Sequence, residues 1–238
     1  MGRVFDRNML IMLVSIMVGV VVITFFIADI VNQQRTDEQI GTITMQHEEE
    51  IGTLEAKNLN FTKHFLKSLG LLDQAREDRA SGNYNFELAF MWYKTALEED
   101  NMSGVQDYKD KAIPNCEHAM VNYSLARSNF VETYDKFNDT IQYTSYEPYI
   151  ELLHLYLNLS KAGEKLCNLR YNASLYLKYL TQNLTYTANN VTFLADVTLL
   201  LDLFAVTELM YSNALVEFNE IKDLVNEYDI AGFDEHIR

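Results

Sequence analysis

The chain has 238 residues, a formal net charge of −15, and only nine glycines and two prolines. So few turn-forming residues exclude an all-β fold, and the acidic balance opposes binding to nucleic acids or anionic lipid headgroups. We therefore expect a nearly all-α protein that binds no nucleic acid. The acidity is typical of a solvated helical surface, and it also suits a high-salt environment or a basic partner.

The first predicted element is a transmembrane signal-anchor helix over residues 9–31. No charged side chain lies between Arg7 and Asp29, and the 21 intervening residues would form about 30 Å of helix, the thickness of a bilayer core. A cleavable signal would have a shorter apolar region and a small residue where Phe26 stands. A buried core helix is the third reading, although such helices are seldom apolar on every face.

Positive charge sets the orientation of this span. Arg3 and Arg7 precede it, whereas the first positive charge after it is Arg35. The positive-inside rule therefore predicts a cytoplasmic stub over residues 1–8. The rest of the chain would lie outside a cell membrane that it crosses once.

Residues 32–58 are expected to continue the span as a helical stalk. Apolar positions recur there at close to 3.5 residues, as in a loose heptad seam. The seam suits pairing with a second copy, and it equally suits a single helix lying on its own domain. Its members are Ile40, Ile43, His47, Ile51, Leu54, Asn58, Phe61 and Phe65.

An extracytoplasmic helical domain is expected over residues 59–228. Apolar stripes predict helices over 61–79 and 86–98, with a turn at Ser81-Gly82-Asn83 between them. The polar run at residues 100–104 should break the pattern again.

The stretch over residues 71–100 resembles a tetratricopeptide hairpin. Ala75, Gly82, Tyr84, Ala89, Tyr93, Ala96 and Leu97 match that family by residue type, and Ala89, Tyr93 and Ala96 also match by spacing. The spacing from Tyr84 to Ala89 is two residues too long, and the closing proline is absent. The resemblance implies a helical hairpin and a habit of binding other proteins. Two ordinary packed helices with a glycine turn are the alternative.

Three longer helices are expected to complete an antiparallel bundle. A short helix should stop at Pro114, and a clear amphipathic helix covers 116–141. The next helix should begin near Pro148 and run to residue 180. Gly163 is the position in it where a kink is expected. Residues 181–190 are expected to be an exposed connection. The last helix, 191–228, is rich enough in Leu and Phe in its first half to be central, and residues 229–238 are expected to be a flexible tail.

The sequence is dense in N-glycosylation acceptors. Eight Asn-x-Ser/Thr tripeptides occur, all beyond the predicted span, where chance predicts about two. They support an exported glycoprotein, with accidental matches in an Asn- and Thr-rich chain as the alternative. The candidate sites are Asn60, Asn101, Asn122, Asn138, Asn158, Asn172, Asn183 and Asn190.

The two cysteines, Cys116 and Cys167, would both be extracytoplasmic. An even count in an oxidising space favours one disulfide between two helices, with two free buried thiols as the alternative.

The sequence gives little support to an enzyme. It contains no phosphate-binding loop, nucleophile elbow or HExxH motif, and Glu151 with His154 is a lone Glu-x-x-His pair without the second copy that a di-iron bundle needs. We expect no cofactor and no metal.

The predicted function is a protein-binding scaffold or accessory subunit of a membrane or cell-surface complex. The alternative is a helical-bundle sensor that binds a ligand between its helices and signals through a partner membrane protein. The tyrosines most suited to facing a partner are Tyr143, Tyr146, Tyr149, Tyr171 and Tyr186.

Overall fold

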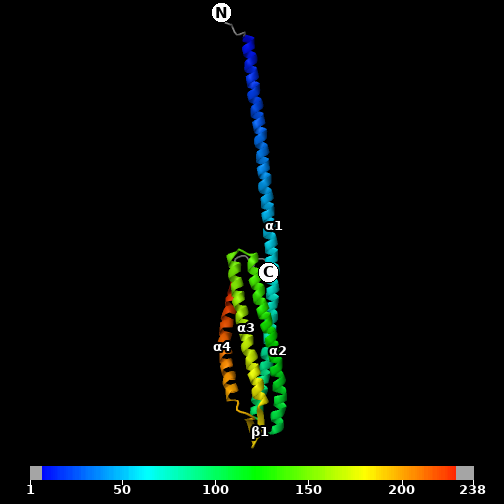
Figure 1. Ribbon diagram of the computed structural model, residues 1–238, viewed down its shortest axis with the longest axis vertical. Coiled ribbons are helices and arrows are strands. Elements are labelled where there is room, and N and C mark those ends of the chain that lie inside the picture. Colours follow the sequence, from blue (N-terminus) through cyan, green and yellow to red (C-terminus); the bar gives the residue numbers. More distant parts are fainter. Residues whose placement is uncertain (1–6, 229–238) are drawn as a thin grey trace. The chain divides into compact units, whose positions relative to one another are not determined.

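The computed structural model describes the backbone of residues 7–228 and the side chains of residues 38–228. Residues 57–228 form an all-α bundle of long antiparallel helices, with one short β-hairpin (Figure 1). The all-α prediction is therefore confirmed. The elements are α1 (Arg7–Leu97), α2 (Met102–Thr140), the 3-10 turn η1 (Ile141–Tyr143), α3 (Glu147–Gln182), β1 (Leu184–Thr187), β2 (Asn190–Phe193) and α4 (Thr198–Glu227).

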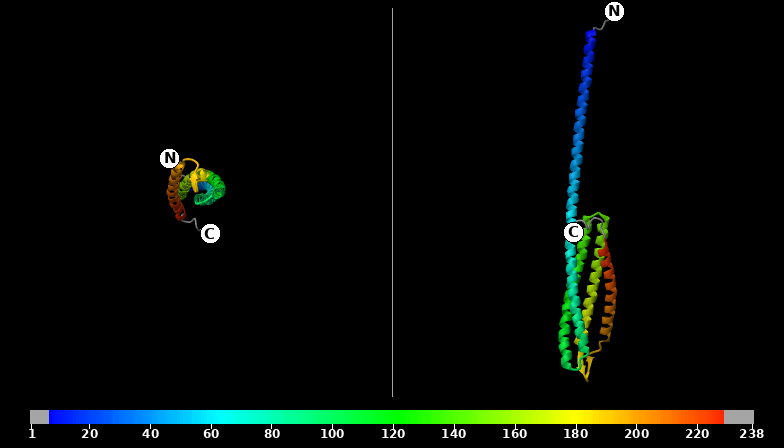
Figure 2. Two further views of the ribbon diagram at one scale, coloured as in Figure 1. Left: turned by 90° about the horizontal axis from the view of Figure 1, so that it is seen from below. Right: turned by 180° about the vertical axis from the view of Figure 1, so that it is seen from behind.

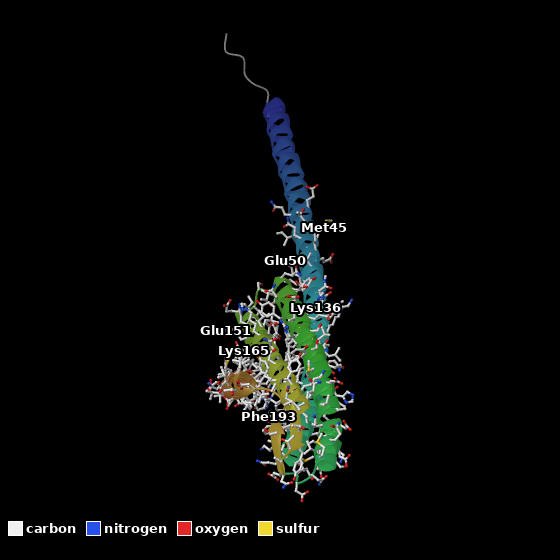
Figure 3. The ribbon with its side chains drawn as sticks, turned by 60° about the horizontal axis from the view of Figure 1, so that its bottom comes forward. Met45, Glu50, Lys136, Glu151, Lys165 and Phe193 are labelled. Carbon is white, nitrogen blue, oxygen red and sulfur yellow. The ribbon has the colours of Figure 1, made fainter. Side chains whose placement is uncertain are left out.

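The chain divides into two compact units, residues 1–56 and 57–238, and α1 contributes to both. In the first unit every described side chain is exposed, including Ile40, Ile43, Ile51 and Leu54 of the predicted stalk seam. Figure 3 shows the side chains of Met45 and Glu50 on this part of α1. The side chains of the predicted cytoplasmic stub and membrane span, and all of the predicted tail, lie outside the described residues.

Two predicted helix boundaries have local causes. A break does occur near the predicted residues 100–104, but α1 ends at Leu97 and α2 already begins at Met102. Asn101 caps α2, and its side-chain oxygen accepts a hydrogen bond from the Gly104 backbone N–H at 2.8 Å. Pro148 lies in the first turn of α3, where its missing N–H needs no partner.

The predicted turn at Ser81-Gly82-Asn83 is wrong, because α1 continues through it to Leu97. Gly82 permits a close helix crossing instead. A Cβ atom there would lie 2.8 Å from the Tyr123 ring of α2. Residues 71–100 are consequently not a helical hairpin in this structure.

The predicted helix end at Pro114 is also wrong. Pro114 lies inside α2, and the buried residues Ala112 and Cys116 flank it. Proline removes one helical hydrogen bond. We attribute the continuation to the packing of these neighbours, which favours one helix through the proline.

A β-hairpin replaces most of the predicted connection and the start of the predicted last helix. Leu184 pairs with Phe193 and Thr187 pairs with Asn190, in antiparallel register. Between the strands, Ala188 and Asn189 both have positive φ, 53° and 65°, as a two-residue type I′ turn requires. Val191, expected to begin a helix, lies in β2, and α4 begins at Thr198.

The bundle core consists of two apolar clusters that follow one another along the helices. The first apolar cluster draws residues from 61–75 of α1, 126–137 of α2, 152–169 of α3 and 211–225 of α4. The second draws from 86–96, 105–123 and 173–184, with Val197 before α4. Figure 2 shows the long helices from two further directions.

The predicted disulfide between Cys116 and Cys167 is wrong. Both thiols are free and buried, one in each apolar cluster. The register explains why: Arg127 pairs with Glu164 at 3.3 Å and Lys178 with Glu117 at 2.8 Å, so α2 and α3 are antiparallel. In that register the cysteines lie about ten residues apart along the helices, or about 15 Å, beyond the reach of a disulfide.

Alkaline pH is expected to destabilise the protein through these thiols. Burial raises the pKa of Cys116 and of Cys167 from 9.0 to about 12. Above about pH 9 each folded thiol keeps its proton while the unfolded thiol ionises. The free energy of unfolding therefore has its full value below about pH 9. It then falls by about 1.4 kcal/mol per pH unit per thiol up to about pH 12.

Urea unfolding at a series of pH values measures this effect. In the double variant Cys116→Ala/Cys167→Ala, the free energy of unfolding should fall much less with pH just above pH 9. The buried Tyr93 and Tyr123 and the half-buried Tyr156, whose pKa values burial also raises, contribute only above their ordinary value of 10.0. A wild-type stability that does not fall from neutral pH to about pH 10 would contradict the prediction.

Candidate functional site

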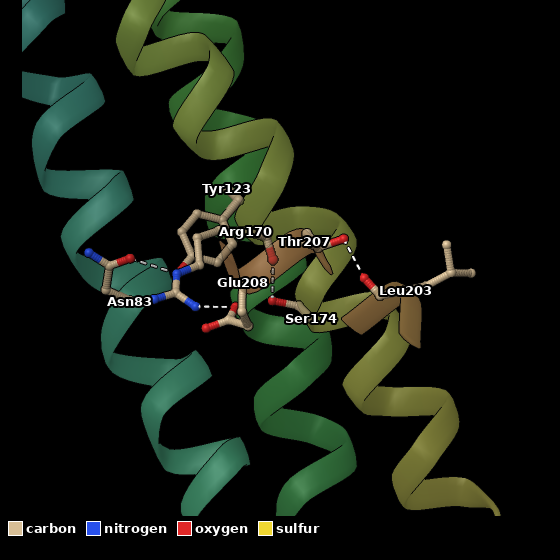
Figure 4. Close-up of polar contacts among 7 residues, drawn as sticks. All are labelled: Asn83, Tyr123, Arg170, Ser174, Leu203, Thr207 and Glu208. Atoms are coloured by element: carbon tan, nitrogen blue, oxygen red, sulfur yellow. Dashed lines mark hydrogen bonds and ion pairs between the residues drawn. The ribbon is translucent and has the colours of Figure 1, made fainter. Parts of the chain in front are cut away.

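A layer of polar side chains lies between the two apolar clusters, and Arg170 of α3 is its centre. Figure 4 shows Arg170 with Tyr123 and Glu208. Its Nη1 donates to Glu208 Oε1 of α4 at 2.5 Å. The guanidinium carbon lies 4.4 Å from the ring centroid of Phe86 and 3.7 Å from that of Tyr211. Arg170 therefore connects α1, α3 and α4 through one charge pair and two cation–π contacts.

Two further hydrogen bonds, in or next to this layer, join α1 to α2. The Tyr123 hydroxyl donates to Asn83 Oδ1 at 2.7 Å, and the Asn129 amide donates to Asp78 Oδ2 at 2.8 Å. Burial raises the pKa of Tyr123, so its hydroxyl stays protonated and available as a donor.

The layer contains guanidinium N–H groups without an acceptor. Arg79 of α1 lies with its guanidinium carbon 4.5 Å from the Phe218 ring centroid. Among the described residues, Arg79 Nε and Nη1 and Arg170 Nε are buried and have no hydrogen-bond partner. Buried donors of this kind are costly to leave unpaired. This makes the layer the first of two candidate sites among the described residues.

Lys109 is buried for a structural reason. Its Nζ donates to the backbone oxygens of Gln182 at 3.0 Å and Leu184 at 2.6 Å. Burial lowers the pKa of this lysine from its ordinary value. The side chain thus satisfies the last carbonyl of α3, a position where a cation is favoured, and the first carbonyl of β1.

The second candidate site is the outer side of α4. Leu199, Leu203, Val206, Leu209, Met210 and Val216 are between 37% and 71% exposed; we name them the α4 outer face. Thr207, Tyr211, Ala214 and Phe218 on the other side of the helix are buried. The prediction that the first half of this helix is central is therefore wrong.

The exposure of α4 is unusual for so apolar a helix. In the described part of the chain, α4 is the one helix long and apolar enough to cross a membrane. The mean hydropathy of its most apolar 18-residue segment is 1.5. Core helices of soluble proteins and signal sequences pass the same test. Only 17% of that window is buried, however, so packing against the bundle does not account for its composition.

The structure separates the five predicted partner-facing tyrosines. Only Tyr146 is exposed, at 50%, and it makes an edge contact with Tyr149. Tyr149 stacks on Phe61, and Tyr143 stacks on His64, both against the first apolar cluster. Tyr171 and Tyr186 pack against the second cluster. The five do not form one surface.

None of the eight predicted glycosylation sites is buried. Asn60, Asn101, Asn138, Asn158 and Asn190 are exposed, and Asn122, Asn172 and Asn183 are half-buried. Their modification stays a prediction.

The possible metal-ligating residues are scattered. Glu151 and His154 are both exposed, and Glu151 Oε2 accepts a hydrogen bond from the Tyr228 hydroxyl. Among residues 38–228 no three His, Cys, Asp or Glu side chains are grouped as a metal site requires.

The sequence pattern alone identified neither candidate site. Arg79 and Arg170 are ordinary charged residues of amphipathic helices, and the leucines of α4 have the composition of a core. The chain was compared with family models, curated proteins and solved structures, and no match to any of them was found.

Proposed function

We propose that this protein is a membrane-anchored scaffold or accessory subunit whose extracytoplasmic helical domain binds another membrane or cell-surface protein. The anchor would be the apolar segment 9–31, with the amino terminus in the cytoplasm. Pairing of two copies through the stalk is part of the proposal, supported by the exposure of Ile40, Ile43, Ile51 and Leu54.

The observation that supports protein binding best is the α4 outer face. Contiguous exposed apolar surface on a protein marks interaction sites more often than chance, whereas scattered apolar residues need no explanation. Leu199, Leu203, Val206 and Met210 are spaced by four, three and four residues, so they lie on one stripe of the helix. A continuous stripe of this length favours a binding surface.

A pull-down tests the proposal. The tagged full chain is recovered from detergent-solubilised membranes of its native host, as wild type and as Leu209→Gln. We expect a partner protein to co-purify with the wild type and to be lost from the variant. Leu125→Gln, at a similarly exposed leucine on α2, is the matched control. Recovery of the chain alone at every detergent strength would remove the scaffold function.

The proposed topology has a separate test. Enzymatic deglycosylation of the chain from its native host should lower its mass, because an outside domain exposes its acceptor sites to the glycosylation machinery. An unchanged mass would leave only the charge distribution around residues 9–31 in support of an outside domain.

A ligand-binding sensor is the second candidate function, and the unpaired N–H groups of Arg79 and Arg170 favour it. Guanidinium groups bind carboxylates and phosphates strongly. A thermal-shift screen of small carboxylates and phosphates against the full chain tests this function. A rise in Tm that Arg79→Lys abolishes supports it, and the absence of any shift counts against it.

A further inference from the structure

The charges on α4 are distributed unevenly around its outer face. Between Leu199 and Val216, α4 has two carboxylates, Asp202 and Glu208, and Glu208 is paired with Arg170. Glu217, the next acidic residue, is paired with Lys165 of α3 at 2.8 Å. The apolar stripe therefore carries a single free negative charge, Asp202, near its beginning.

The end of α4 is strongly acidic. Glu220, Asp223 and Glu227 are all exposed, and Lys222 is the only basic residue of the whole helix. The carbonyl end of a helix adds partial negative charge at the same place. An approaching surface thus meets an apolar stripe that leads into a concentrated negative field.

This negative field argues against binding of a second copy of the chain to the α4 outer face. Two α4 helices packed antiparallel would bring Glu220 and Asp223 of one copy toward Asp202 of the other. Two packed in parallel would place each carboxylate beside its own equivalent. Both arrangements oppose like charges, and each chain carries a net charge of −15.

The field also argues against a lipid surface. Helices that lie in the membrane interface carry lysine and arginine beside their apolar face. On α4 the one basic residue is Lys222, and anionic headgroups would be repelled by Glu220, Asp223 and Glu227 at the end of the helix.

We infer that the α4 outer face binds an amphipathic helix of another protein, one whose apolar stripe is followed at one end by lysine or arginine. This inference rests on the proposed function and specifies the chemistry of the partner. The basic end lies beside Glu220, Asp223 and Glu227, which fixes the direction of the bound helix. The α4 outer face spans about 26 Å from Leu199 to Val216, so a helix of about five turns covers it.

Binding of synthetic peptides to the full chain, held in a phosphatidylcholine nanodisc, tests the inference. The probe is a labelled amphipathic helical peptide of about five turns with a leucine stripe and lysines at one end. The controls are the same peptide with glutamates for the lysines and a scrambled lysine peptide. By fluorescence anisotropy we expect the lysine peptide to bind about tenfold more tightly than the glutamate peptide, and the scrambled peptide not to bind.

Two variants of the protein separate the apolar and the charged contributions. Leu209→Gln should weaken binding of the lysine peptide about tenfold, whereas Leu125→Gln should not change it. Glu220→Gln/Asp223→Asn should reduce the preference for the lysine peptide over the glutamate peptide. Glu132→Gln, at an exposed carboxylate of α2, is its control. Raising the salt concentration should also reduce the difference in affinity between the lysine and glutamate peptides.

Three results would overturn the inference. The first is equal affinity for the lysine and glutamate peptides, or no binding of either. The second is sedimentation of the wild type as a dimer that Leu209→Gln dissociates, which would identify a second copy as the occupant. The third is binding of the protein to anionic vesicles that depends on Leu209. If a partner still co-purifies in the pull-down, the proposed function survives any of these results.

Discussion

Replacement of Arg170 by alanine is expected to lower the free energy of unfolding by about 3 kcal/mol. The guanidinium is mostly buried, is paired with Glu208, and lies between the rings of Phe86 and Tyr211. Its removal leaves the Glu208 carboxylate without its partner and takes away two cation–π contacts. The substitution also opens a gap between three helices, which adds a packing cost.

Urea unfolding of the full chain, followed by circular dichroism, measures this loss. Arg127→Ala is the matched control, because Arg127 also pairs with a glutamate, Glu164, but on an exposed surface. Exposed ion pairs contribute little, so this control should lose less than about 1 kcal/mol. Adding Glu208→Gln to Arg170→Ala should recover part of the loss, since no unpaired carboxylate then remains.

An equal cost for Arg170→Ala and Arg127→Ala would contradict the role given to the polar layer. If Arg170→Ala prevents folding altogether, Arg170→Met allows the same comparison. It keeps much of the side-chain volume and removes the charge, its hydrogen bonds and its two cation–π contacts.

The parts of the fold that the sequence predicts well have the strongest periodicity. Phe130 and Phe137 lie seven residues apart on α2, and both are fully buried. The start of α3 at Pro148 and the break at Asn101 follow from local chemistry, which a short window of sequence contains.

The mistaken boundaries arise where tertiary contacts override local signals. Gly82 and Pro114 are helix breakers by propensity, and both lie inside long helices. At Gly82 the cause is the Tyr123 ring on a helix about 40 residues away in sequence, and no local pattern reports that contact. The β-hairpin was missed for the opposite reason, because its strands are only four residues long.

The candidate docking surface could not be predicted, because composition does not distinguish a buried leucine from an exposed one. Leu199 and Leu209 belong to a helix as apolar as a membrane span, which is why a central position was expected. The apolar pattern of residues 191–228 includes Phe218, which is buried. It also includes Leu201 and Leu209, which are exposed, so the pattern could not show which side of α4 the bundle leaves uncovered.

Gly163→Ala is expected to destabilise the protein by about 2 kcal/mol, although alanine is the better helix former by about 1 kcal/mol. Gly163 is buried in α3, and a Cβ atom there would overlap Cε1 and Cζ of the Phe130 ring. Real atoms do not approach so closely, so the ring or the helix must shift. Gly163 is thus a site of close contact between α2 and α3, and the predicted bend is not needed to explain it.

Gly70→Ala is the control for this prediction, because Gly70 is also helical but a Cβ atom there would meet nothing within 4 Å. It should stabilise the protein by about 0.5–1 kcal/mol in the same urea titrations. Adding Phe130→Leu to Gly163→Ala should cost less than the two separate losses combined, since the smaller side chain leaves room for the new methyl group. Stabilisation by Gly163→Ala equal to that by Gly70→Ala would show that the ring can move aside freely, and the close contact would then not determine how α2 packs on α3.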